Sequence, residues 1–320
     1  MTDNPPELLS CFGKLLRART HIHELVEAMN AFRDQQHYTF DRYDNSDADT
    51  DPLVRVQWRV RVIEPIPDTW AYIVGDAIQN MRSALDHAVG QVARQRLGFG
   101  DADVQRCRLQ FPICDSAADF RKARADLQKA GMPQDVLKAL ARLQPYNNGG
   151  DPGLGLAELR DLSNLDKHRQ ITVVAQGIYD SDVTVDPPLE LVNKDVKRGP
   201  LTDGMVFATV KWKRTPRSGE LVLRPSVRYV ESLFVPWRDE YWPVGVVLEM
   251  AFKDVVLAVE ELVRDHMGPL DAYFMEQYLD GADEREDKIL GLVATDDQIR
   301  EFRASLGEAA RLGSTRPTGR

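Results

Sequence analysis

The sequence predicts an α+β protein, with a helical bundle core, a segregated antiparallel β-sheet over about residues 171–236 and an N-terminal β-strand or hairpin. Two observations predict this class. Segments before residue 170 and after residue 240 carry apolar residues three and four positions apart, which is the spacing of helices that bury one face. Between them, short runs of β-branched residues are separated by turn residues, which is typical of antiparallel strands.

The helices are expected where these apolar stripes occur, at residues 6–36, 70–96, 116–130, 133–144, 154–168 and 242–266. The segment 271–279 is expected to continue the last of them. The helix at 70–96 has the clearest stripe, with core positions at Val74, Ile78, Met81, Leu85, Ala88 and Val92. These residues recur at alternating steps of four and three, so this helix should bury one continuous face.

The clearest strand is LVRVQWRVRVI, residues 53–63. Apolar side chains alternate there with polar ones, which include Arg55, Arg59 and Arg61. A period of two predicts a strand with one apolar face and one basic face. A second, short strand is expected at residues 107–113, CRLQFPI.

The domain organisation follows from this order of elements. We expect a single α+β domain over residues 1–280, in which segments 1–170 and 240–280 form the helical core and segment 171–238 is a β-rich insert. Residues 281–320 are expected to be a C-terminal helical extension followed by a disordered tail, because the last residues are Ser, Thr, Pro, Gly and Arg.

Composition excludes several classes of function. The formal net charge is −9, whereas proteins that coat duplex DNA need a basic surface, so any contact with RNA must be local. The most apolar stretch, residues 243–262, carries charged residues, which predicts no contact with a membrane. The start of the chain does not resemble a signal peptide and the three cysteines are scattered, so we expect a cytoplasmic location. Walker, GxGxxG and GxSxG motifs are absent, and the sequence predicts no cofactor.

The stretch NMRSALDHAV, residues 80–89, carries the first candidate site. Arg82 and His87 lie about 140° apart around a helix axis, because successive residues turn by about 100°. Arg82 can instead pair with Asp86, one turn further along. A single helix does not aim Arg82 and His87 at one phosphate, so a second element or a second copy of the helix would have to complete such a site.

Arg-x4-His in a long helix, preceded by the polar residue Asn80, resembles the motif of the HEPN family. The resemblance implies a helical bundle in which the arginine and histidine of two protomers meet across a homodimer interface and cleave RNA without a metal. It implies that His87 handles protons during attack by the ribose 2′-hydroxyl. Arg82 would hold the charge that develops on the phosphate, and Asn80 would support the site. The β-rich segment is not part of the usual bundle of that family.

A second polar cluster, NLDKHR, ends the predicted helix at 154–168. Asp161, Asn164 and His168 lie on one helical face, three and four residues apart. The two clusters are similar enough to suggest one composite site, in which the supporting residues would be Asp86, Asn164, Asp166, His168 and Arg169. The alternative is that the cations simply complement the negative end of a helix dipole.

The most basic segment, KWKRTPR, contains the candidate RNA-binding residues Lys211, Trp212, Lys213 and Arg214. The basic face of the strand at 53–63 is the second such patch. Cations interleaved with an aromatic ring suit single-stranded RNA, which is held by stacking and by phosphate contacts. The alternative is a hairpin end with solvated basic side chains.

Three functions remain open at this point. The first is a metal-independent endoribonuclease, with RNA as substrate and a toxin or defence role by analogy with the family. The second is a non-catalytic module that binds a partner or a nucleotide, in which the motif would be buried by salt bridges. The third is a metal-dependent hydrolase with Asp86, His87, Asp166 and His168 as ligands.

Overall fold

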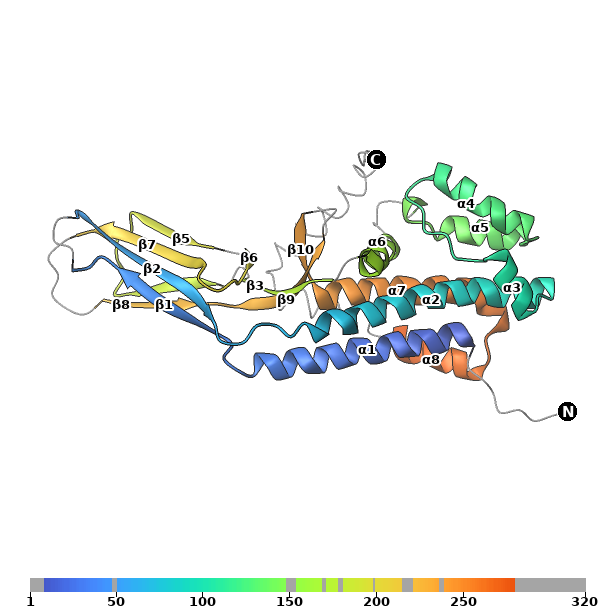
Figure 1. Cartoon of the computed structure of the whole chain (residues 1–320), viewed down its shortest axis with the longest axis horizontal. Helices are drawn as coiled ribbons and strands as arrows, with labels where there is room; N and C mark the ends of the chain where they lie inside the picture. Colours follow the sequence, from blue (N-terminus) through green and yellow to red (C-terminus); the bar gives the residue numbers. More distant parts are fainter. Residues whose placement is uncertain are drawn as a thin grey trace. The chain divides into compact units, whose positions relative to one another are not determined.

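The computed structural model describes residues 9–47, 51–147, 154–168, 171–177, 181–197, 199–214, 221–235 and 239–279. It confirms the α+β class, because the described residues form helices and antiparallel sheets (Figure 1). The predicted C-terminal extension and tail, residues 281–320, lie outside the described residues. No helix in the described part of the chain is both long and apolar enough to cross a membrane.

The chain divides into two compact units. The helical unit comprises Met1–Leu25, Ala71–Ile171 and Gly245–Arg320, and the sheet unit comprises Val26–Trp70 and Thr172–Val244. Each unit draws on segments far apart in the sequence, so the β-rich segment forms its unit together with the N-terminal strands. The grouping of residues 1–280 into one domain stays a prediction.

The helices are α1 (Ser10–Arg33), α2 (Thr69–Leu97), α3 (Asp101–Cys107), α4 (Ala117–Lys129), α5 (Gln134–Arg142), α6 (Leu154–His168), α7 (Val244–Val263) and α8 (Pro269–Leu279), with short 3-10 turns at Pro145–Asn147 and Arg264–His266. The predicted core stripe of α2 is confirmed, because all six of its residues are at most 1% exposed. Burying one continuous apolar face leaves the polar residues of α2, among them Arg82 and His87, outside this stripe.

The prediction that 271–279 continues the preceding helix is wrong. The chain leaves α7 at Val263 and starts α8 at Pro269. Proline lacks an amide hydrogen and is tolerated in the first turn of a helix but not in its interior. The Gly268 amide donates to Asp271 Oδ2 at 2.7 Å, and the Leu9 amide donates to Asp271 Oδ1 at 2.9 Å, so this helix start also holds the beginning of α1.

The prediction of a strand at 107–113 is also wrong. Residue 107 ends α3, and residues 109–114 run as a loop that pairs with no strand in the described part of the chain. Its backbone is held by side chains instead: the Phe111 amide donates to Asp86 Oδ1 at 2.9 Å and the Cys114 amide donates to Gln144 Oε1 at 2.9 Å. The fully buried Gln144 donates in turn to the Pro112 carbonyl at 2.8 Å. The alternating pattern of this loop therefore reflects contacts with side chains of α2 and of the turn after α5, and not pairing with a neighbouring strand.

Among its described residues, the sheet unit contains three antiparallel sheets. The first has the order β1 (Tyr38–Asp44), β2 (Leu53–Val62), β7 (Val206–Lys213), β5 (Asn193–Val196); the second has β10 (Glu240–Pro243), β9 (Tyr229–Val235), β3 (Val173–Gly177), β6 (Gly199–Pro200); the third pairs β4 (Asp182–Asp186) with β8 (Val222–Ser226). The predicted N-terminal hairpin is β1–β2, and β2 also pairs with β7. The predicted alternation of β2 is confirmed, because Val56 and Trp58 are at most 2% exposed while the arginines between the apolar residues are exposed.

Candidate functional site

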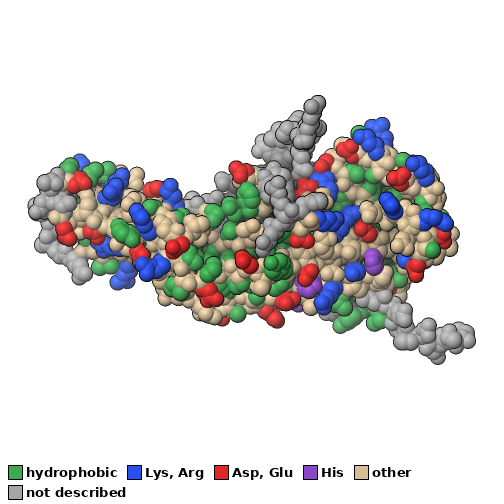
Figure 2. All heavy atoms as spheres, in the orientation of Figure 1, with side chains coloured by type: hydrophobic (Ala, Val, Ile, Leu, Met, Phe, Trp, Pro, Cys, Tyr) green, Lys and Arg blue, Asp and Glu red, His purple; other side chains and the backbone are tan. Residues whose placement is uncertain are grey.

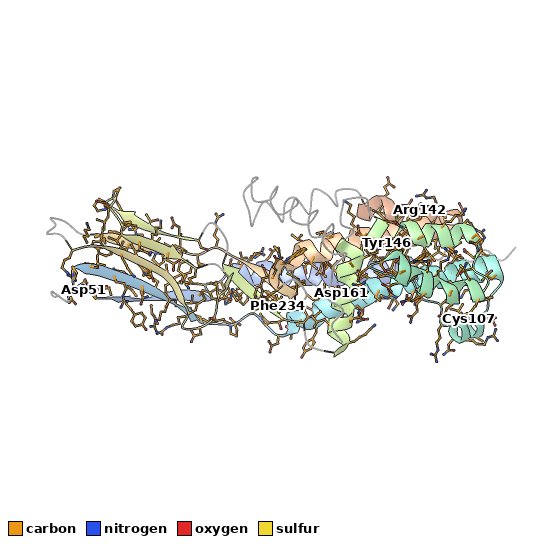
Figure 3. All side chains as sticks on the ribbon, turned by 90° about the horizontal axis from the view of Figure 1, so that it is seen from above. Asp51, Cys107, Arg142, Tyr146, Asp161 and Phe234 are labelled. Carbon is orange, nitrogen blue, oxygen red and sulfur yellow. The ribbon has the colours of Figure 1, made fainter. Side chains whose placement is uncertain are left out.

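Two polar stripes on α2 and α6 face each other across a cleft of about 500 Å³, which we name the α2–α6 cleft. The stripes are Gln79, Arg82, Ser83 and Asp86 on α2, and Arg160, Ser163, Asn164 and Lys167 on α6. Each follows the spacing i, i+3, i+4, i+7, which places four side chains on one helical face. The loop 108–114 and α4 complete the lining. Figures 1 and 3 show α6, labelled at Asp161 in Figure 3, crossing the long helices of this unit.

A glycine allows the two helices to approach closely. A Cβ atom at Gly75 would lie 2.7 Å from Asp166 Oδ1, which is too close for a normal contact. Asp166 Oδ2 accepts a hydrogen bond from Gln79 Nε2 at 3.3 Å. Asp166, predicted as a supporting residue of the site, therefore packs against the backbone of α2 and helps to position α6.

Arg82 is held by groups of its own chain. Its Nη2 donates to Asp86 Oδ1 at 3.1 Å and to the Phe111 carbonyl at 2.7 Å, and its side chain is 17% exposed. Asp86 thus binds both the arginine and the Phe111 amide. Burial raises the pKa of Asp86, although Arg82 and the Phe111 amide act in the opposite direction. The Arg82–Asp86 pair that the spacing allowed is present.

His87 opens onto a different cleft of about 630 Å³, which we name the His87 cleft. Its lining comes from the start of α1, from α2 and α3 and from the loop that follows α3: Leu9, Ser10, Asp86, His87, Gly90, Gln91, Arg94, Asp101, Val104 and Leu109. Burial lowers the pKa of His87, and the positive charges of Lys14 and Arg94 lower it further, against the effect of Asp86. A lowered pKa keeps the imidazole neutral at neutral pH, so it can accept a proton.

The α2–α6 cleft offers cations and one unpartnered hydroxyl. Arg160 is paired with Asp115 at 2.9 Å and with Asp161 at 2.7 Å. Lys167 and Arg108 are exposed, and neither forms an ion pair with a residue that the structure describes. Ser163 is 2% exposed, and its Oγ finds no hydrogen-bond partner within the described residues. A buried hydroxyl without a partner is uncommon in a folded protein and points to a missing ligand or water.

The remaining residues of the two predicted clusters are divided between several places. Asn164 lines the α2–α6 cleft, whereas Asn80 lies in neither cleft and donates to the Asp76 carbonyl at 2.8 Å. The side chain of His168 and all of Arg169 lie outside the described residues. The sequence analysis did not assign Arg160, Ser163 or Lys167 to the site, although Lys167 lies within the NLDKHR cluster. Their i, i+3, i+4, i+7 spacing, shared with the stripe on α2, is the signal that could have found them.

The four predicted RNA-binding residues point in different directions. Trp212 is 7% exposed and lies opposite Val54 on the apolar side of the sheet, so it is not available for stacking on a base. The Arg214 guanidinium donates to the backbone carbonyls of Asn45, Ser46 and Asp51, at 2.9, 2.6 and 3.0 Å, and so holds the β1–β2 turn. Lys211 and Lys213 alternate with Trp212 and lie on the opposite face of β7.

Three further findings bear on function. Among the described residues, no three His, Cys, Asp or Glu side chains are close enough together to hold a metal ion, so no described ligand set supports the metal-dependent hydrolase. Acidic and basic side chains are intermixed on the face of the helical unit in Figure 2, so the net charge does not produce a uniform acidic field there. No family model, curated protein or solved structure matches this chain.

Proposed function

We propose that the helical unit is a non-catalytic binding module that holds a small phosphorylated ligand of the nucleotide class in the α2–α6 cleft. The observation that carries this proposal is the buried Ser163 hydroxyl, which has no hydrogen-bond partner among the described residues and lines a cleft that also contains Lys167 and Arg108. A phosphate oxygen is the acceptor that these donors lack. Hydrogen bonds from cations to phosphate are about twice as strong as those between neutral groups, so a phosphorylated ligand would bind this cleft more tightly than a neutral ligand of the same size.

The shape and chemistry of the cleft support the same ligand class. Its volume of about 500 Å³ is within the range of small-molecule sites. Its lining combines cations with hydroxyl and amide groups from Ser83, Asn164 and Gln79, which can bind a ribose or a base edge. Arg82 is held by Asp86 and Phe111, so it is preorganised as part of the wall and is not free to move to a reacting phosphate.

The test is the change in thermal unfolding midpoint when AMP, ATP or inorganic phosphate is added, because a ligand that binds the folded state raises the midpoint. We expect at least one nucleotide to raise it for the wild type. Lys167→Ala and Ser163→Ala should abolish the rise, whereas Lys122→Ala, an exposed lysine on α4 outside the cleft, should leave it intact. If no nucleotide or phosphate changes the midpoint of the wild-type protein, the proposal fails.

A metal-independent ribonuclease at His87 is the second candidate, favoured by the neutral imidazole of His87 in its own cleft. In that cleft Arg94 lies two turns beyond His87 on the same helical face, where it pairs with Asp101 at 2.8 Å. Arg94, rather than Arg82 of the same chain, is therefore a cation of this cleft that could contact a phosphate beside His87. In the dimeric arrangement of the HEPN family, Arg82 would have to come from a second copy.

The ribonuclease candidate is tested by incubating a mixed RNA pool with the protein in EDTA. The comparison uses wild type, His87→Ala, Arg82→Ala and Arg94→Ala. Cleavage that yields cyclic-phosphate ends and is lost in His87→Ala would support it, and the arginine variants would show which cation acts. Nucleotide binding without cleavage, retained in His87→Ala, would leave the binding module as the function.

A further inference from the structure

A row of polar side chains crosses the first sheet on its outer face, the face opposite Trp58 and Trp212. Arg55 on β2 lies directly opposite Lys211 on β7, and Lys211 lies opposite Asn193 on β5. On the other side of β2, just after β1, the side chain of Asn45 accepts a hydrogen bond from the backbone amide of Arg55. The two basic patches of the sequence therefore join in one row, in which two cations lie between two asparagines. Two carboxylates share the outer face: Asp41 lies opposite Arg59 and pairs with Arg61, and Asp195 lies opposite Thr209.

This arrangement does not stabilise the fold by charge pairing. Like charges directly opposite one another in an antiparallel pair are destabilising. Neither Arg55 nor Lys211 forms an ion pair with a described residue, and Lys213 extends the same positive face by one position. By contrast, Arg61 at the other end of β2 is paired with Asp41 at 2.8 Å. An external anion would relieve the repulsion between Arg55 and Lys211.

An exposed aromatic ring lies beside the row. Tyr43 on β1 is opposite Gln57, so it is the diagonal neighbour of both Arg55 and Arg59 on the outer face. Tyr43 is 51% exposed, so its ring is accessible to a ligand. The Arg59 guanidinium lies 5.0 Å from the centroid of the ring, in a cation–π contact that orients it. The outer face thus presents an oriented aromatic ring next to Arg55 and Lys211, neither of which has an ion-pair partner in the part of the chain that the structure describes.

We propose that this outer face, formed by Tyr43, Arg55, Arg59, Lys211 and Lys213, binds single-stranded RNA. Phosphates would contact Arg55 and Lys211, and a base would stack on Tyr43 and the Arg59 plane. A β-sheet face that carries an aromatic ring and flanking cations can bind single-stranded RNA, because unpaired bases stack on the ring and phosphates contact the cations. In a duplex the faces of the bases are covered by stacking, so Tyr43 would not contribute to binding it. The chain is acidic overall, so contact with RNA is confined to this basic patch. The proposal uses no residue of the α2–α6 cleft or the His87 cleft and does not rest on the proposed function.

The experiment measures fluorescence anisotropy of a labelled oligouridylate with the full chain, over a series of salt concentrations. We expect saturable binding by the wild type. Arg55→Ala and Lys211→Ala should each lower the slope of log K against log salt by about 0.7, since that is the contribution of one phosphate contact in a single strand. Tyr43→Ala should weaken binding about 5-fold or more, and Tyr43→Phe, which keeps the ring, should bind as the wild type does.

The matched control is Lys194→Ala on β5. It removes the same charge, but Lys194 lies opposite Val210 on the other face of the sheet and pairs with Asp182 at 2.6 Å. It should bind oligouridylate with wild-type affinity and salt dependence, and circular dichroism should show that every variant is folded. The proposal is overturned by absence of saturable binding, by equal losses in Lys194→Ala and Lys211→Ala, or by wild-type affinity in Tyr43→Ala. It is also overturned if duplex RNA or phosphatidylserine vesicles bind as tightly, with the same loss in Lys211→Ala.

Discussion

Arg82 and His87 open onto different clefts of the helical unit, although less than two helical turns separate them on α2. Asp86 lies between them and lines both clefts, and its carboxylate holds Arg82 at 3.1 Å. The arginine is thereby fixed on the side of α6, and the histidine faces α1 and α3. Within one chain, Arg82 and His87 therefore do not contact the same phosphate.

The role of Asp86 as a link between α2 and the loop 108–114 predicts a loss of stability on its removal. Asp86→Ala would leave the Phe111 amide without its partner and Arg82 without its counter-ion. We expect the free energy of unfolding to fall by about 1–3 kcal/mol, measured by urea denaturation. Asp126→Ala, which removes an exposed carboxylate paired with Lys129, should change it by about 0.5 kcal/mol or less. Equal effects of the two variants would contradict this role.

Three glycines in helices test how closely the helices pack. A Cβ at Gly155 would lie 2.6 Å from the Met250 carbonyl oxygen, which is backbone and cannot turn away, so Gly155→Ala should cost about 2 kcal/mol or more. Gly75→Ala should cost less, because the Asp166 side chain can rotate, and its cost should shrink further in an Asp166→Ala background. Gly13→Ala on α1 meets no atom within 4 Å and should stabilise by about 0.5–1 kcal/mol. The free energies of unfolding of the three variants, measured by thermal or urea denaturation, check this order of stabilities.

Ser163→Ala should separate ligand binding from folding. Removing a buried hydroxyl that lacks a partner should raise the stability of the ligand-free protein by about 1 kcal/mol, because the cost of its desolvation disappears. The same variant should lose the stabilisation by nucleotide. A ligand-free protein that is destabilised by this substitution would show that the hydroxyl has a structural role, and would remove the main support for the proposed ligand.

The lowered pKa of His87 predicts a pH-dependent stability. The unfolded chain binds a proton at the ordinary histidine pKa, near 6.5, whereas the folded protein resists protonation until a lower pH. The contribution of His87 to stability is therefore fully present above about pH 6.5 and is lost as the pH falls through the folded pKa. His87→Gln should flatten the fall in unfolding free energy between about pH 7 and pH 5. An unchanged slope would contradict burial of this imidazole.

The burial of Trp212 predicts opposite effects for neighbouring residues of β7. Trp212→Ala would leave a cavity against Val54 and should cost about 3–5 kcal/mol of unfolding free energy. Lys213→Ala, next along the strand on the exposed face, should change it by about 0.5 kcal/mol or less. Urea denaturation of both variants decides whether Trp212 is a core residue or a surface one.

Local periodicity carried enough information to predict most elements. The core stripe of α2 and the alternation of β2 are patterns that a single segment displays in full, and both are buried as the patterns require. The spacing of Arg82 and Asp86 likewise predicted their pairing, because it depends on helix geometry alone. Prediction from the sequence was wrong where side chains from distant segments hold the backbone of a loop. Residues 109–114 alternate like a strand, but Asp86 and Gln144 take the place of a neighbouring strand.

The sequence by itself determined which faces of α2, α6 and β2 are polar, because periodicity follows from the geometry of one helix or strand. Only the tertiary structure decided what those faces meet. The close approach of Gly75 and Asp166 brings two polar stripes into one cleft, and antiparallel pairing sets Arg55 against Lys211 while turning Trp212 inward. Contacts between segments more than eighty residues apart depend on packing and strand register, which no local pattern specifies.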